Sequence, residues 1–112
     1  MIIRRRRGNM RSFSQLRVGG YYKTAYGVCV DHRDYSINDD RIIRIDSKSL
    51  ESGAAGIVVT LLSNNGVMSS VSWRSERSVI NKPLAFLSVS VDEVTRFKRL
   101  IVKNFRKKLA EF

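Results

Sequence analysis

The segment 57–73 constrains the fold most, because it predicts two strands joined by a tight turn. Ile57–Leu62 is a continuous apolar run of strand length, which is typical of a buried strand. Asn64-Asn65-Gly66 follows, and Asn-Gly is a strong hairpin signal because both residues tolerate positive φ angles. Val67–Trp73 then alternates between two sets of side chains, as a half-buried strand does. The centre of the chain therefore predicts an antiparallel hairpin.

Further strands are predicted on both sides of this hairpin. Tyr21–Val30, Arg41–Asp46 and Lys82–Val89 are rich in Tyr, Val, Ile or Phe, which favour strands. Between them, Asp31–Asp40 and Ser47–Gly56 are rich in small and polar residues and predict loops. A chain of 112 residues with this pattern predicts one mainly β domain.

The last part of the chain predicts an amphipathic helix over about residues 90–111. Ser90 and Glu93 have the spacing of a capping box at its start. Lys and Arg fill one face, and apolar residues recur at helical spacing on the other, at Val94, Phe97, Leu100, Ile101, Phe105 and Leu109. We expect the apolar face to pack across the mouth of the β-structure.

The charge of the chain favours an anionic partner. The formal net charge is +11, with 21 Lys and Arg against 10 Asp and Glu. Such a surplus is typical of proteins that bind nucleic acid, a phosphorylated ligand or an anionic membrane. Residues 1–24 carry seven basic groups and no acid, and residues 96–108 carry seven more and no acid. Residues 1–12 are predicted to be a mobile basic arm unless a ligand orders them.

Several classes of protein are disfavoured by what the sequence lacks. Cys29 is the only cysteine and His32 the only histidine, which excludes an intramolecular disulfide and a Cys- or His-rich zinc site. We expect no enzyme, no catalytic residue, no metal and no cofactor, because the carboxylates show no plausible acid–base division. No run approaches the roughly 18 apolar residues of a membrane span. We therefore expect a cytoplasmic protein.

Two short motifs carry the chemistry of a possible ligand site. Residues 6–11 contain Arg-x-x-x-Arg, as Arg7 and Arg11, and residues 34–39 contain Asp-x-Ser-x-x-Asp. The planar arginine fork donates paired hydrogen bonds to a phosphate or to guanine O6 and N7. Asp34 can accept from guanine N1–H and N2–H, and Ser36 can donate or accept at short range. Together these residue types suit a ligand with phosphates and guanines.

The order of these motifs, followed by Val71-Ser72-Trp73, Leu84-Ala85-Phe86 and the helix start at Ser90, resembles the PilZ family across nearly the whole chain. The resemblance implies a six-stranded antiparallel β-barrel over residues 13–112, with a C-terminal helix and a flexible arm of residues 1–12. It also implies a non-catalytic bacterial receptor for the second messenger cyclic di-GMP. Ligand capture would order the arginine arm against the barrel and alter a surface that a downstream protein reads.

The resemblance also implies a set of ligand-binding residues: Arg6, Arg7, Arg11, Asp34, Ser36, Asp39 and Trp73. Asp39 departs from the family pattern, which has glycine at this position. Aspartate tolerates left-handed backbone geometry, so the turn can form. A carboxylate beside a bisphosphate ligand would be repulsive, and we expect it to weaken binding.

Simpler interpretations of these residues stay open. The segment 4–7 can be a solvated basic tail, or one that touches nucleic acid non-specifically. Asp34 and Ser36 can form a plain Asx-turn, and Trp73 can be a core aromatic. The strand tyrosines at positions 21, 22 and 26 can stack on bases or be ordinary strand residues.

Two other functions also stay open. One is a nucleic-acid-binding β-domain that uses its basic ends and loosely resembles the Whirly group. The other is a degenerate PilZ adaptor that binds only protein, which Asp39 makes credible. The sequence favours neither a monomer nor a homodimer, and neither one bound ligand nor a stacked pair.

Overall fold

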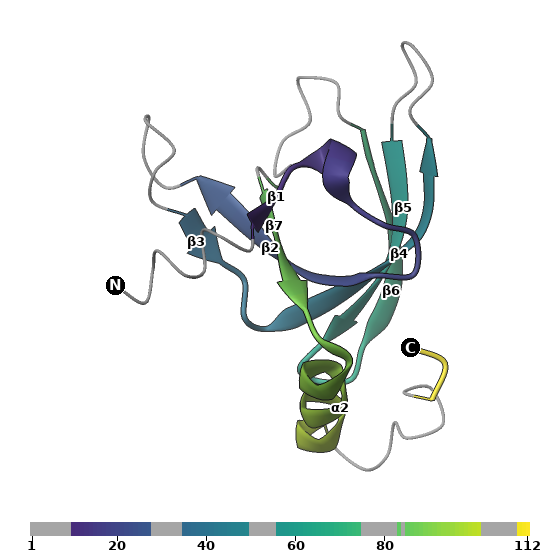
Figure 1. The fold of residues 1–112 in the computed structure, drawn as a ribbon. Coiled ribbons are helices and arrows are strands. Elements are labelled where there is room, and N and C mark those ends of the chain that lie inside the picture. The colour runs from purple at the N-terminus through teal and green to yellow at the C-terminus, as the bar shows by residue number, and fades with distance from the viewer. Residues whose placement is uncertain (1–9, 28–34, 50–55, 75–82, 84, 102–109) are drawn as a thin grey trace.

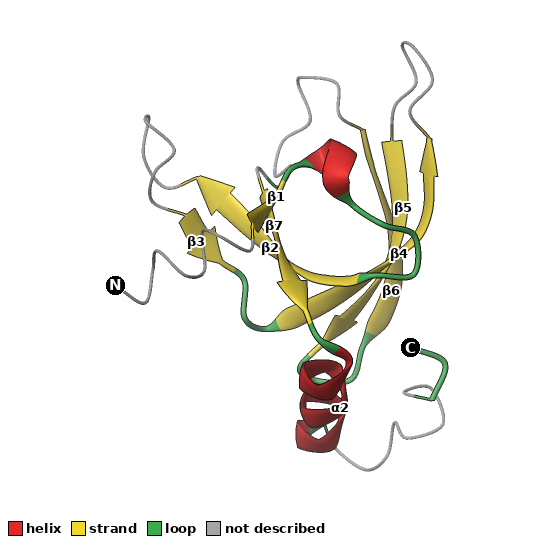
Figure 2. Ribbon diagram, viewed as in Figure 1, coloured by secondary structure: helices red, strands yellow, loops and turns green. Residues whose placement is uncertain are grey.

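A computed structural model describes residues 10–27, 35–49, 56–74, 83, 85–101 and 110–112. This part of the chain is mainly β, as predicted, with one α-helix and one short 3₁₀ helix (Figure 2). In chain order the elements are β1 (Met10–Arg11), η1 (Phe13–Gln15), β2 (Tyr21–Gly27), β3 (Tyr35–Ile37), β4 (Arg41–Ser49), β5 (Gly56–Ser63), β6 (Met68–Arg74), β7 (Ala85–Val89) and α2 (Val91–Leu100).

The strands form one curled antiparallel sheet (Figure 1). Its order is β1-β7-β2-β4-β5-β6, and β3 pairs with β2 off this path. The prediction of a closed six-stranded barrel is therefore wrong, because the described sheet has seven strands and ends in β1 and β6. Strand β1 is only two residues long and pairs with β7 alone among the described strands. Such a short edge offers too few backbone groups to join β6 and close the sheet.

The predicted central hairpin is confirmed. Strands β5 and β6 pair from Gly56 opposite Arg74 to Leu62 opposite Met68. Gly66 has a φ of +89°, which an L side chain rarely adopts, and Ser63 N–H donates to the Val67 carbonyl at 2.9 Å.

Two predicted loops are partly wrong. The segment Asp31–Asp40 contains β3, which pairs with Ala25–Gly27 of β2, while residues 31–34 lie outside the described part. Polar residues form a strand here because β2 extends beyond its pairing with β4 and offers unpaired backbone groups. The segment 47–49 belongs to β4 after a register shift between Ile45 and Ser47.

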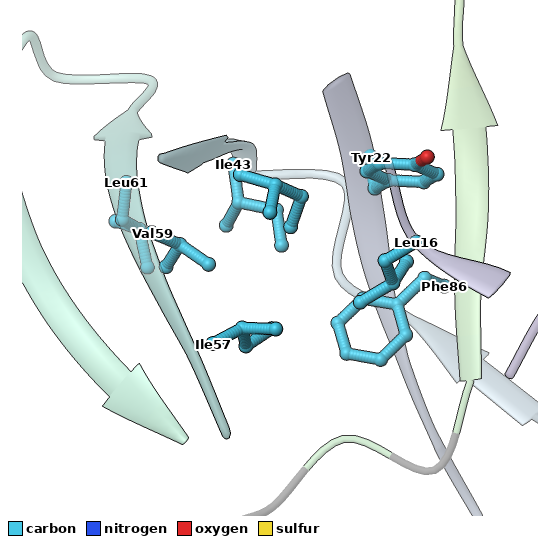
Figure 3. Packing of buried hydrophobic residues seen from close by; sticks show 8 residues of the cluster. Leu16, Tyr22, Ile43, Ile57, Val59, Leu61 and Phe86 are labelled. Carbon is cyan, nitrogen blue, oxygen red and sulfur yellow. The ribbon is translucent and has the colours of Figure 1, made fainter. Parts of the chain in front are cut away.

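The concave face of the sheet holds an inner cluster of buried residues, made of Leu16, Tyr22, Ile43, Ile45, Ile57, Val59, Leu61 and Phe86 (Figure 3). Trp73 on β6 packs against this cluster, and its ring centroid lies 6.2 Å from that of Phe86 on β7. Strands β6 and β7 are not neighbours in the sheet order. The contact exists because the sheet curls until its two flanks meet across apolar side chains.

The opposite face holds a helix-side cluster of Ile42, Leu62, Val89, Val94, Ile101 and Phe112. The Ser90 side chain accepts the Glu93 N–H at 3.1 Å, as the predicted cap requires. The helix ends at Leu100, because Ile101 is extended with a ψ of 144°, whereas the prediction extended it to about residue 111. Phe105 and Leu109 lie outside the described residues. None of the described helices has the length and apolarity needed to cross a membrane.

The helix-side cluster also corrects one predicted packing residue. Leu100 keeps the helical spacing of the apolar face, yet its side chain is 83% exposed. Val94 is buried and Phe97 is half-buried in the same helix. Leu100 is exposed because the helix packs on the sheet mainly through its first turns and ends before Ile101 returns to the core.

Phe112 is held on the helix-side face by several contacts. Its ring is 3% exposed and lies 5.4 Å from the Tyr21 ring, centroid to centroid. The Arg44 guanidinium lies 5.7 Å from the centre of the same ring. The Tyr21 hydroxyl and Arg44 Nη1 both donate to the main-chain oxygen of Phe112. The segment 110–112 is thereby packed against β2 and β4.

The packing of Phe86 gives a first prediction. Phe86→Ala should lower the free energy of unfolding by about 3–5 kcal/mol, because it empties the contact between the two flanks of the sheet. Urea denaturation followed by tryptophan fluorescence measures the change. Ser88→Ala, at an exposed position of the same strand, is the control and should change stability by less than about 0.5 kcal/mol. A loss below about 1 kcal/mol for Phe86→Leu and Phe86→Ala alike would contradict this account of the core.

Candidate functional site

The structure describes four of the seven residues predicted to bind ligand. Arg11 lies in β1, Ser36 in β3 and Trp73 in β6, and Asp39 lies in the turn between β3 and β4. The other three, Arg6, Arg7 and Asp34, lie outside the described residues.

Strand register places Arg11 and Ser36 on the same face of the sheet. Arg11 is opposite Phe86 in β7, and Phe86 is opposite Thr24 in β2. Ser36 is opposite Tyr26, two residues beyond Thr24 in the same strand. Directly opposite residues share a face, and side chains alternate with a period of two. All five side chains therefore lie on the face of the inner cluster, to which Phe86 belongs.

The two motif residues are too far apart to touch. Arg11 in β1 is separated from Ser36 in β3 by three strand spacings of about 4.8 Å each, or roughly 14 Å across the sheet. The gap excludes direct contact between Arg11 and Ser36.

Arg11 keeps its charge available on this face. Its side chain is half-buried, and Nη1 donates to the Met10 carbonyl at 3.3 Å. No carboxylate of the described residues forms an ion pair with it. Ser36 is exposed. The described part of the face thus offers a cation and a hydroxyl with no carboxylate to oppose an anion.

Asp39 belongs to the other face. The Lys23 ammonium lies 3.1 Å from Asp39 Oδ1 and 3.1 Å from Glu93 Oε2 of α2. Lys23 stands between Tyr22 and Thr24 in β2, so it points to the helix side, where its side chain is 16% exposed. One lysine therefore ties the β3–β4 turn to the helix. The ion pair places a positive charge beside the Asp39 carboxylate.

The ion pairs line a pocket of about 310 Å³ on the helix side. Lys23 and Arg96 contribute two positive charges, Asp39 and Glu93 two negative ones, and Phe97 and Leu100 apolar surface. Its charges balance, so it is not suited to a doubly charged anion. Among the described residues, no group of three or more His, Cys, Asp or Glu side chains is placed to hold a metal.

Trp73 packs into the core. Its side chain is half-buried, and its ring lies 6.2 Å from Phe86 at an interplanar angle of 56°. The indole thus packs against the inner cluster, as the core interpretation of this residue expects.

Lys23 and Glu93 are structural residues of the site that sequence reasoning missed. Lys23 is the single charge in a strand of aromatic and small residues, Tyr21–Gly27, and this isolation is the only sequence signal for its role. Glu93 was expected to reach back to the helix cap, whereas its carboxylate pairs with Lys23. Both contacts depend on how β2, the β3–β4 turn and α2 come together in the fold, which a local sequence pattern does not reveal.

A double-mutant cycle tests the bridge between turn and helix. Lys23→Met and Glu93→Gln should destabilise the protein non-additively, with a coupling of about 0.5–1 kcal/mol that weakens in 1 M salt. Chemical denaturation of the single and double variants measures it. Lys23→Met combined with Arg99→Gln, which changes an exposed residue of the same helix, is the matched control and should be additive. Additivity in the Glu93 cycle would mean that this ion pair does not form in solution.

Comparison of the chain with protein-family models, with curated proteins and with solved structures finds no match in any of the three. Its function is therefore inferred from its own residues and their arrangement.

Proposed function

We propose that this chain is a non-catalytic receptor for cyclic di-GMP of the PilZ type, acting in the bacterial cytoplasm. One observation carries the proposal. Arg11 ends the first motif and Ser36 lies in the second, and these residues, 25 positions apart, share one face of the sheet. One residue from each of two weak motifs on the same face is a stronger signal than either motif in the sequence.

The chemistry of the face suits the ligand. Arg11 can donate two parallel hydrogen bonds to a phosphate or to a guanine edge. Ser36 can hydrogen-bond a second part of the ligand across the gap of roughly 14 Å. A cyclic dinucleotide, which carries two bases and two phosphates, presents groups to both at once. A single phosphate ion cannot reach both residues.

The arm supplies further contacts. Pairing of β1 with β7 anchors its end at Met10 and Arg11. Arg7 is four residues earlier, so its Cα lies at most about 14 Å from that of Arg11. In the proposal, Arg6, Arg7 and Asp34 complete the site. Capture of the ligand then orders the arm against the sheet and changes a surface that a partner protein reads.

Binding of nucleic acid is the second candidate, because the net charge is +11. Arg96, Lys98 and Arg99 place three cations on α2. This function would rest on phosphate contacts without base recognition, and its affinity would fall steeply with salt concentration. An adaptor that binds only protein is the remaining alternative.

Calorimetric titration with cyclic di-GMP tests the receptor. The wild type should give saturable heat at tens of micromolar or below, and Arg7→Ala and Arg11→Ala should each weaken binding roughly 10- to 100-fold through loss of charge-assisted hydrogen bonds. Arg17→Ala is the matched control, because Arg17 is an exposed arginine outside both motifs. It should leave the affinity unchanged.

The alternatives give different results in the same experiment. Absence of heat from the wild type would exclude the receptor and favour the adaptor. Equal losses for Arg17→Ala and Arg11→Ala would indicate general electrostatic attraction. If oligonucleotides bind tightly at low salt and lose that affinity with a steep salt dependence, nucleic acid becomes the better candidate.

Asp39→Gly tests whether Asp39 lies on the same face of the sheet as the ligand. We expect the affinity for cyclic di-GMP to change by less than about threefold, because the Asp39 carboxylate is paired with Lys23 on the helix side and exposed pairs contribute little. Calorimetry measures the affinity, and Asp40→Gly in the same turn is the control. A rise of tenfold or more would show that Asp39 faces the ligand, as the sequence alone suggests.

A further inference from the structure

Strand β2 carries three tyrosines, and two of them are committed to packing. The Tyr22 ring is 5% exposed and lies 6.4 Å from Phe86 in an edge-to-face pair. Its hydroxyl accepts the Arg17 N–H at 3.0 Å. Tyr21 packs against Phe112 on the helix side and donates to its main-chain oxygen. Neither ring is available to a ligand on the inner face.

Tyr26 has different surroundings. It is half-buried near the end of β2, on the face it shares with Arg11 and Ser36. Its partner across the strand pair is Ser36, an exposed residue whose small side chain cannot cover a phenol ring. The next residue, Gly27, has no side chain. Within the described part of the chain, Tyr26 takes part in no aromatic pair and no side-chain hydrogen bond.

The position of Tyr26 fits a base that is held by the two motifs. It lies two residues, or about 7 Å along β2, from Thr24, which is in line with Arg11. Arg11 lies in β1, which is two strand spacings, or about 10 Å, to the side of β2. A planar base stacked on Tyr26 would therefore have Ser36 at its edge, and the rest of a dinucleotide would extend toward Arg11.

We propose that Tyr26 is the residue of the site on which a base of the ligand stacks. The inference rests on the proposed function and extends it by one residue. It assigns to Tyr26 the stacking role for which Trp73 is poorly placed, since Trp73 packs on Phe86. Stacking needs a flat π surface and does not need the hydroxyl.

Substitutions at position 26 distinguish the contribution of the aromatic ring to binding from that of the hydroxyl. Tyr26→Ala should weaken cyclic di-GMP binding roughly 5- to 100-fold, the range of base–aromatic stacking. Tyr26→Phe keeps the ring and should retain the wild-type affinity. Tyr21→Phe removes a hydroxyl from the opposite face and is the matched control, with no expected change. Thermal unfolding of each variant checks that the fold is kept.

A spectroscopic measurement tests stacking directly. On saturation of the wild type with cyclic di-GMP, the ring-proton resonances of Tyr26 should move upfield, because a purine ring current shields protons above its face. Those of Tyr22 should stay in place. This readout does not require a substituted protein, so it decides the proposal even if Tyr26→Ala fails to fold.

The outcomes distinguish the two proposals. If the wild type binds while Tyr26→Ala binds equally well, or while the Tyr26 resonances do not move, the stacking role is overturned and the receptor function remains. If the wild type does not bind, the receptor function fails and the stacking role fails with it. If Tyr26→Phe loses as much affinity as Tyr26→Ala, the hydroxyl rather than the ring contacts the ligand, and the stacking role is overturned.

Discussion

Strand β2 makes three strand pairings, and the positions of the candidate site residues follow from them. Along one edge it pairs with β7, and along the other it pairs first with β4 and then with β3. The chain must therefore turn between β3 and β4, where Asn38 N–H donates to the Thr24 carbonyl at 2.9 Å. Arg11 is placed through β7, Ser36 by direct pairing, and Asp39 through its ion pair with Lys23.

The alternation of β2 divides the molecule into two faces with different roles. Tyr22, Thr24 and Tyr26 face the inner cluster and the proposed ligand, while Tyr21 and Lys23 face α2 and Phe112. Neighbouring residues of one strand thus serve opposite surfaces. A shift of the β2 backbone on ligand binding would be transmitted to α2 directly, because Lys23 forms ion pairs with both Asp39 of the β3–β4 turn and Glu93 of the helix. The fold therefore offers a short physical connection between the two faces of the sheet.

Local signals in the sequence predict the parts of this structure whose contacts are close in the chain. The hairpin at Gly66 and the helix start at Ser90 are of this kind. The strand β3 was missed because its pairing depends on the exposed edge of β2 rather than on its own polar residues. The helix end at Leu100 was missed because helical spacing continues beyond it. For the site, residue types suggested Arg11 and Ser36, but only register through two intervening strands places them on one face.

Phe112 packs against side chains of two strands that come much earlier in the chain, Tyr21 of β2 and Arg44 of β4. Its contact with Tyr21 joins residues 91 positions apart, so the loop that it closes spans most of the chain. During synthesis, β2 leaves the ribosome long before Phe112 does. Tyr21 then lacks the ring against which it packs until residue 112 is made. A chain that stalls or is cut before this point would keep the Tyr21 surface that packs on Phe112 open to aggregation or to chaperones.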